Sequence, residues 1–218
     1  MNISEKVKYV WWATMRCGSR SISDVLQHYD FFNYELENKF TPTSDIRYVY
    51  FSHTLDVPET YTQYPLIAQT RNPYSRALSH WHLNCYKNSS TDNDKLVVLQ
   101  TFEEYLTSTS IMQSLINPYT KYSPKYLIRY EHLEKDLLQL PFVDLNNSNV
   151  KKSFEGAILN NYYLNEGVEK VEGSLLRSSD ARYALWQSYY NSKLASIVYE
   201  KFALEFEMFK YGKNSWKI

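Results

Sequence analysis

Glycine and cysteine are scarce in this 218-residue chain, which contains five and two of them respectively. Any ligand-binding loop in this chain can therefore contain only a few glycines. Charge of one sign is also lacking, because 24 Lys and Arg residues balance 24 Asp and Glu residues. Proteins that bind nucleic acid usually carry a basic excess. The composition therefore argues against nucleic acid as a partner, and basic residues that bind a ligand must do so by their placement.

Long apolar runs are absent as well. No stretch reaches the ~18 apolar residues of a membrane span, and no apolar run with a small-residue cleavage site opens the chain. The only cysteines, Cys17 and Cys85, fall in a predicted loop and a predicted helix, which favours free thiols in a reducing compartment. We expect a cytoplasmic protein without stable membrane insertion, or a soluble piece of a longer one, with a single domain over residues 1–218.

Strands and helices are predicted to alternate. Short blocks of β-branched and aromatic residues predict strands at residues 7–13, 47–51, 66–70 and 126–130. Apolar periodicity predicts helices at residues 21–29, from Pro73, at 131–138 and over much of 180–206. Thr101 and Glu104 form a capping-box pattern, and the polar, Asn-rich residues 144–153 predict a loop. This order predicts an α/β fold with a mostly parallel central sheet flanked by helices.

The turn after the first predicted strand is a candidate anion site. Its residues are Arg16, Cys17, Gly18, Ser19, Arg20 and Ser21. Gly18 lets the backbone approach a ligand, and the first N–H groups of the following helix have no partner inside that helix. The turn lacks the first glycine and the lysine of the G-x-x-x-x-G-K-[ST] loop of ATP and GTP enzymes. The alternative is a solvated turn that happens to hold arginines.

A second candidate begins at Arg71, where another predicted strand ends, and runs through Pro73 to Ser79. An arginine at a strand end can bind a phosphate through two parallel hydrogen bonds. An ion pair with a nearby carboxylate is the alternative for this residue. Two such segments in one small neutral chain predict a phosphorylated ligand that is bound in two places.

These segments resemble the signatures of the sulfotransferases that use 3′-phosphoadenosine 5′-phosphosulfate (PAPS). Arg16-Cys-Gly-Ser-Arg-Ser21 is similar to the family's loop for the 5′-phosphosulfate, and Arg71-Asn-Pro-Tyr-Ser-Arg-Ala-Leu-Ser79 to its R-x-x-x-x-x-x-x-S signature for the 3′-phosphate. Residues 127–133 and 197–211 resemble later segments of the family, the latter in its carbohydrate-modifying members. The resemblance implies the P-loop nucleotide-kinase-like fold of sulfotransferases.

The resemblance also implies a catalytic base at the end of a strand between the two segments, where His53 stands. An imidazole with a pKa near ~6.5 can accept a hydroxyl proton at neutral pH. A structural hydrogen bond is the alternative for His53. Many members carry lysine at the position of Arg16, and arginine can neutralise charge there but is a poor acid.

The expected reaction is transfer of a sulfuryl group from PAPS to a hydroxyl of a small molecule, carbohydrate or glycolipid, with release of 3′-phosphoadenosine 5′-phosphate (PAP) and without a metal. Arg177 or Arg182 could complete the 3′-phosphate contacts, and Trp12, Trp81 or Tyr130 could stack on adenine. Two alternatives stay open: a small nucleotide or metabolite kinase that needs magnesium, and a non-catalytic binder of adenosine bisphosphates. The acceptor and the oligomeric state are not readable from the sequence.

Overall fold

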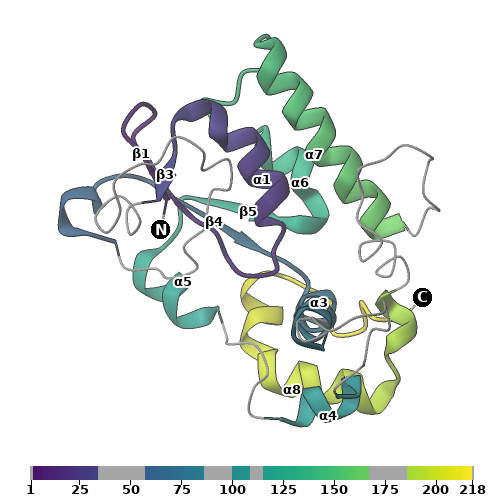
Figure 1. Cartoon of the computed structure of the whole chain (residues 1–218). Coiled ribbons are helices and arrows are strands. Elements are labelled where there is room, and N and C mark those ends of the chain that lie inside the picture. The colour runs from purple at the N-terminus through teal and green to yellow at the C-terminus, as the bar shows by residue number, and fades with distance from the viewer. Residues whose placement is uncertain (1, 34–56, 86–99, 109–114, 167–185, 218) are drawn as a thin grey trace, which may run out of the picture. The chain divides into compact units, whose positions relative to one another are not determined.

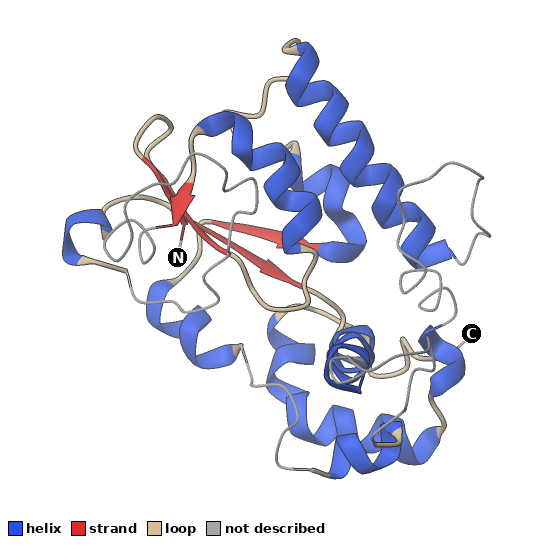
Figure 2. Cartoon of the chain, in the orientation of Figure 1, coloured by secondary structure: helices blue, strands red, loops and turns tan. Residues whose placement is uncertain are grey.

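The computed structural model describes residues 2–33, 57–85, 100–108, 115–166 and 186–217. The chain divides into two compact units, each built from two segments. Unit 1 comprises Met1–Arg71 and Pro118–Tyr163, and unit 2 comprises Asn72–Asn117 and Leu164–Ile218. All strands of the described residues lie in unit 1, whereas unit 2 is helical there (Figure 1, Figure 2).

Unit 1 is built on a five-stranded mixed sheet with the order β3-β1-β2-β4-β5. The strands are β1 (Asn2–Ser4), β2 (Tyr9–Trp12), β3 (Phe32–Asn33), β4 (Leu66–Thr70) and β5 (Tyr126–Arg129). β2, β4 and β5 are parallel neighbours, and β1 pairs antiparallel with both β2 and β3. The predicted α/β class with a mostly parallel sheet is confirmed. The strand predicted at 66–70 has the observed bounds, and the strand predicted at 47–51 lies outside the described residues.

The antiparallel hairpin of β1 and β2 was not predicted. β1 has only three residues, two of them polar, so it shows no strand periodicity. Lys8 takes a left-handed conformation with φ 60° in the connecting turn, and the Asn2 side chain donates a hydrogen bond to the Trp11 carbonyl at 3.3 Å. The first predicted strand, residues 7–13, is consequently shortened to Tyr9–Trp12.

Three helices cover one face of this sheet: α1 (Ser19–Leu26), α6 (Leu133–Leu137) and α7 (Ser148–Glu166) (Figure 1). Their apolar side chains form a buried core with Trp11, Ile67 and Ile128 of three neighbouring strands. On β2 the next residue points to the opposite face. There the Trp12 ring lies 5.3 Å from the ring of Tyr119 in α5 (Ile116–Tyr122).

The loop predicted at residues 144–153 is partly wrong, because α7 already begins at Ser148. The Asn147 side chain accepts hydrogen bonds from the backbone N–H groups of Asn149 and Val150, at 3.0 and 3.3 Å. This is the usual role of asparagine immediately before a helix. The Asn-rich composition therefore marks a helix start within the predicted loop.

Unit 2 packs α3 (Pro73–Cys85), α4 (Phe102–Thr107) and α8 (Ser192–Met208) around one apolar core, together with the 3₁₀ turn Trp186–Tyr189. The predicted helix start at Pro73 is confirmed, as is the capping box of Thr101 and Glu104. The two side-chain to backbone bonds of this capping box measure 3.2 and 2.7 Å. Across the described parts of both units, every helix is too short or too polar to traverse a lipid bilayer.

A buried ion pair joins α3 to α8 inside unit 2. Nη2 of Arg76 lies 3.0 and 2.8 Å from the two carboxylate oxygens of Glu205, and both side chains are at most 1% exposed. Glu205 also accepts the backbone N–H of Leu115 at 2.8 Å. Arg76 belongs to the segment that resembles a phosphate signature, and the structure gives it this internal role.

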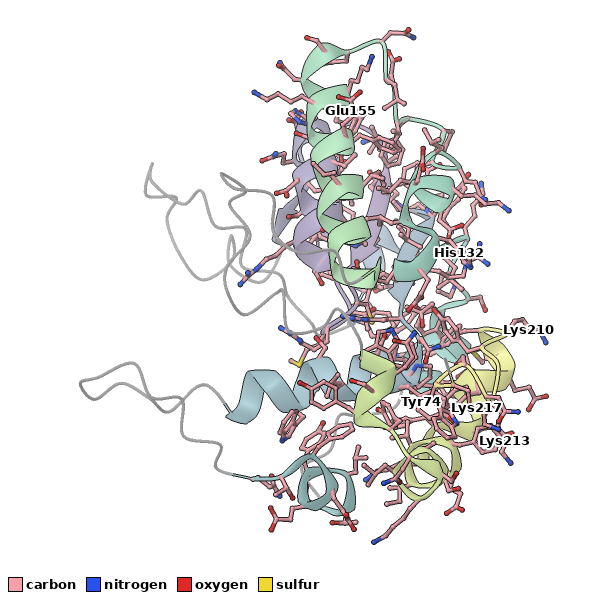
Figure 3. The ribbon with its side chains drawn as sticks, turned by 90° about the vertical axis from the view of Figure 1, so that its right-hand side faces the viewer. Tyr74, His132, Glu155, Lys210, Lys213 and Lys217 are labelled. Carbon is pink, nitrogen blue, oxygen red and sulfur yellow. The ribbon has the colours of Figure 1, made fainter. Side chains whose placement is uncertain are left out.

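The C-terminal segment is fastened to the start of α3. The Tyr74 hydroxyl donates to the Lys213 carbonyl at 2.8 Å, and the Asn72 amide donates to the Ser215 hydroxyl at 2.8 Å. Figure 3 shows Tyr74 beside Lys213, whose carbonyl accepts this hydrogen bond. Burial and the neighbouring Tyr199 raise the pKa of Tyr74 to about 12, so the phenol stays protonated and continues to donate near neutral pH.

We expect Arg76→Met or Glu205→Gln to lower the free energy of unfolding by about 3–5 kcal/mol, because each leaves a buried charge or a buried polar partner uncompensated. Urea denaturation measures this loss. The double variant Arg76→Met/Glu205→Leu should regain much of it, since both charges are then removed. Glu103→Gln, which breaks the exposed pair with Lys193, is the matched control and should leave the midpoint essentially unchanged. A double variant as unstable as the sum of the single ones contradicts this account.

Candidate functional site

The loop between β2 and α1 has an unusual backbone. Arg16 and Gly18 both take left-handed conformations, with φ 63° and 82°. Ile22 donates the first hydrogen bond of α1, to the Gly18 carbonyl at 3.2 Å. The N–H groups of the three preceding residues come before this first bond, so they have no partner inside the helix, and Gly18 gives them no side-chain cap. Such successive N–H groups at a helix start form a cradle for an anion.

The side chain of Gln69 on β4 holds this loop in place. Its amide nitrogen donates to the Thr14 carbonyl at 2.9 Å and to the Ser19 hydroxyl at 2.7 Å, and Ser19 donates to the Thr14 carbonyl at 3.0 Å. The Trp11 indole in turn donates to the side-chain oxygen Oε1 of Gln69 at 3.2 Å, which fixes the orientation of the side-chain amide. Sequence reasoning missed Gln69, because a buried glutamine inside an apolar strand carries no motif. Its only signal is the polar residue in that strand.

Tyr130, directly after β5, connects the loop to Arg71. A Cβ atom placed on Gly18 would lie 2.4 Å from Cδ2 of the Tyr130 ring, so the ring edge occupies the space beside this glycine. The Arg71 guanidinium carbon lies over the same ring, 4.3 Å from its centre. Nη1 of Arg71 lies 3.4 Å from the Arg16 carbonyl oxygen, a long hydrogen bond. The end of β4 and the loop after β2 therefore meet around one aromatic ring.

Two buried hydroxyl groups stand at the same end of the sheet. Thr70 is the last residue of β4, and Thr14 lies at the same level beyond β2, because Trp12 is in register with Ala68. Thr14 and Thr70 are 1% and 0% exposed, and neither side-chain oxygen has a hydrogen-bond partner in the described structure. A buried hydroxyl without a partner is costly. These two groups are accordingly available to a ligand or an ordered water.

The charges around the loop are mostly positive. Arg16 is half-buried and Arg20 is exposed, while Arg71 is 6% exposed. The nearest acid on α1 is Asp24, one turn after Arg20. Partial shielding from water raises the pKa of Asp24, although the charge of Arg20 opposes this. Three guanidinium groups and a helix start therefore favour an anion at the carboxyl ends of β2 and β4.

Cys17 contributes to the loop in a different way. It is fully buried and not disulfide-bonded, its Sγ lies 3.6 Å from the Met15 carbonyl oxygen, and its N–H donates to the Thr14 carbonyl at 3.3 Å. These contacts stabilise the turn. The thiol points into the protein, and any ligand contact by Cys17 stays a prediction.

The remaining predicted site residues belong to unit 2, to the core of unit 1 or to parts of the chain outside the described residues. Ser79 is 2% exposed and belongs to unit 2, whereas Arg71 closes unit 1, so their joint role stays a prediction. His53, Arg177 and Arg182 lie outside the described residues. The aromatic residues proposed for adenine stacking are core residues: Trp12 is 3%, Trp81 is 7% and Tyr130 is 2% exposed.

Among the described side chains, no group of three or more His, Cys, Asp and Glu residues has the arrangement of a metal site. Compared with models of known families, with curated proteins and with solved structures, the chain has no significant match.

Replacing Gly18 by Ala is expected to destabilise unit 1 and to abolish anion binding. The new methyl group would overlap Tyr130, and a non-glycine residue at φ 82° is strained. Gly156→Ala in α7 is the control, since a Cβ there meets no atom within 4 Å; it should stabilise the helix by about 0.5–1 kcal/mol. Thermal denaturation measures both. Equal effects of the two variants would contradict the proposed packing of Tyr130 on Gly18.

Proposed function

We propose that this protein is a sulfotransferase that moves a sulfuryl group from PAPS to an acceptor hydroxyl, with a carbohydrate or glycolipid headgroup as the favoured acceptor. One observation carries the proposal. Arg71, at the end of β4, lies on Tyr130 and contacts the left-handed Arg16–Gly18 turn before α1. These are the two segments whose residues resemble the phosphate signatures of that family. The observation supports a shared anion site.

The residues at this site fit a phosphosulfate group. Sulfuryl and phosphoryl oxygens are acceptors, and the site offers donors: the N–H groups at the start of α1, the guanidinium groups of Arg16 and Arg71, and the hydroxyls of Thr14 and Thr70. When bound, PAPS supplies an activated sulfuryl group attached to a phosphate leaving group. Arg16 and the N–H groups of the loop would then neutralise the charge that develops on the departing phosphate oxygens.

The acceptor hydroxyl must lose its proton as it forms the new bond to sulfur. His53 is proposed to accept that proton, and the phosphate leaves with the electrons of the broken sulfur–oxygen bond. Because phosphate is a weak base, the leaving group does not require a proton from Arg16, which stays charged throughout. This division of roles agrees with arginine at a position where the family often has lysine.

The second candidate is a kinase of small metabolites. This candidate is supported by the loop between β2 and α1, because enzymes that transfer phosphoryl groups also bind phosphate at a loop between a strand and a helix. A kinase requires magnesium and normally a loop lysine, and residues 14–21 contain no lysine. A non-catalytic bisphosphate binder would use the same contacts without turnover.

Binding of PAP is the first test. At ~100 times its dissociation constant, PAP should stabilise the protein by about 2.7 kcal/mol, which a thermal-shift assay detects. ATP with magnesium should give a smaller shift. A larger shift with magnesium and ATP than with PAP would favour the kinase, and no shift with PAP would refute the proposal.

Thr70→Val provides a sharper test of the site. Removal of a buried hydroxyl without a partner should leave the free protein as stable or make it more stable. If the hydroxyl contacts the ligand, the same change should weaken PAP binding about five- to tenfold, which isothermal titration calorimetry measures. Ser153→Ala, which removes a hydroxyl that is hydrogen-bonded to His28, is the control and should leave PAP affinity unchanged. Unchanged PAP affinity in Thr70→Val would remove Thr70 from the site.

His53→Ala separates an enzyme from a binder. Since His53 is proposed to act on the acceptor, its loss should reduce sulfuryl transfer by ~10²–10⁴-fold and leave PAP affinity within a factor of two. Transfer is followed as PAP release in the presence of a panel of glycans. A parallel loss of PAP affinity would place His53 in cofactor binding or in the fold instead.

A further inference from the structure

A small pocket lies at the other end of the parallel strands of unit 1. It has a volume of about 270 Å³, and Val10, Pro65 and Leu66 form part of its wall at the amino ends of β2 and β4. The end of α5 and the start of β5 complete it with Tyr122, Ser123 and Lys125. At about 3.3 Å per residue, the length of β4 separates this pocket from the Thr70 end of the strand by roughly 13 Å. The pocket is therefore distinct from the anion site around Arg16 and Arg71.

Several polar groups of the wall are already engaged. The Thr62 hydroxyl donates to the Glu59 carbonyl at 2.8 Å, and the Gln63 amide donates to the Thr60 carbonyl at 2.6 Å. The Tyr64 hydroxyl donates to Glu5 at 2.7 Å, and the Glu5 charge is paired with Lys8. The polar groups on this side of the pocket therefore already have hydrogen-bond partners, and the charges of Glu5 and Lys8 cancel.

The opposite side offers donors. Lys125 is exposed and forms no ion pair with the residues that the structure describes, and its ammonium nitrogen lies 5.7 Å from the centre of the Tyr126 ring. Its backbone is fixed by a hydrogen bond of 3.0 Å from Lys125 N–H to the Leu66 carbonyl. The hydroxyls of Tyr122 and Ser123 form no hydrogen bond with the residues that the structure describes. One ammonium and two hydroxyl groups thus border an apolar wall.

The backbone of Ser123 supports a ligand role for this edge. Ser123 follows the last residue of α5 and takes φ 44°, a conformation that favours glycine at this position. Its N–H is held by the Tyr119 carbonyl at 3.0 Å. A serine in this conformation is strained, yet it places a hydroxyl at the pocket, as observed strain at binding sites often does.

We propose that this pocket binds a small monocarboxylate with a compact apolar body. The carboxylate would pair with Lys125 and accept hydrogen bonds from Ser123 and Tyr122, while the body would lie against Val10 and Leu66. A single cation matches a single negative charge. A volume of about 270 Å³ favours a ligand smaller than a nucleotide, and the apolar wall disfavours a bare inorganic anion. This site does not depend on the proposed sulfotransferase activity.

The test compares two probes of the same shape, 3-phenylpropionate and its uncharged analogue 3-phenyl-1-propanol. Each is titrated into the ¹⁵N-labelled full chain, and amide chemical shifts are followed by NMR. We expect the acid to shift the amides of Val10, Leu66, Ser123 and Lys125, and to bind at least tenfold more tightly than the alcohol. Equal affinities, or acid-induced shifts confined to the loop at Arg16, would overturn the proposal.

Two variants at the pocket and one matched control complete the test. Lys125→Gln should lower the affinity for 3-phenylpropionate at least tenfold and leave the affinity for 3-phenyl-1-propanol unchanged. Lys121→Gln removes a neighbouring charge that lies on the Tyr122 ring but outside the pocket, and should change acid affinity less than twofold. Ser123→Gly should raise the melting temperature of the protein, because glycine removes the backbone strain at this position. The same variant should bind 3-phenylpropionate more weakly, because the hydroxyl is lost. Equal losses in the two lysine variants would show a general charge effect and refute the site.

Discussion

The position of the Tyr130 ring is the constraint on which the proposed anion site depends. One edge of the ring fills the space that a side chain at residue 18 would need, and its face carries the Arg71 guanidinium. The ring thereby couples three consecutive strand ends of a parallel sheet. Glycine is required in the loop for two reasons at once, its φ of 82° and the contact with the ring. An arginine that lies on an aromatic face is also held in one plane, which limits the directions in which it can bind an anion.

The two ends of β4 in unit 1 lie in chemically different surroundings. Its carboxyl end holds guanidinium groups, hydroxyls and the start of α1, all of which are donors. Its amino end borders a pocket whose lining includes Val10, Leu66 and Lys125. Gln69, near the carboxyl end, uses its buried amide to bind the neighbouring loop, and Tyr119 donates to its backbone carbonyl at 2.6 Å from the opposite face. Parallel strands produce this asymmetry because every strand presents the same end to the same side.

Features with a local cause could be predicted from the sequence. β4, the helix start at Pro73 and the capping box at Thr101 depend on residues within a few positions of each other. The order of strand, turn and helix around Gly18 was also predicted, since a strand followed by a glycine-containing turn and a helix is a local pattern, and anion binding by this loop stays a prediction. The helix start after Asn147 was not predicted, because asparagine is favoured both in loops and immediately before helices. The contacts of Gln69 and Tyr130 and the pair of Arg76 with Glu205 join residues far apart in sequence, and no periodicity reveals such partners.

The Arg76–Glu205 pair has a consequence for how the protein is made on the ribosome. Unit 2 consists of two segments, and the whole of Pro118–Tyr163 is synthesised between them. A growing chain therefore exposes Arg76 and the apolar face of α3 long before Glu205 and the partner helix emerge. Unit 1 can close first, while the first half of unit 2 waits as an aggregation-prone intermediate. Chaperone protection of the nascent chain would matter most in this interval, and translation pauses within α8 would lengthen the exposure.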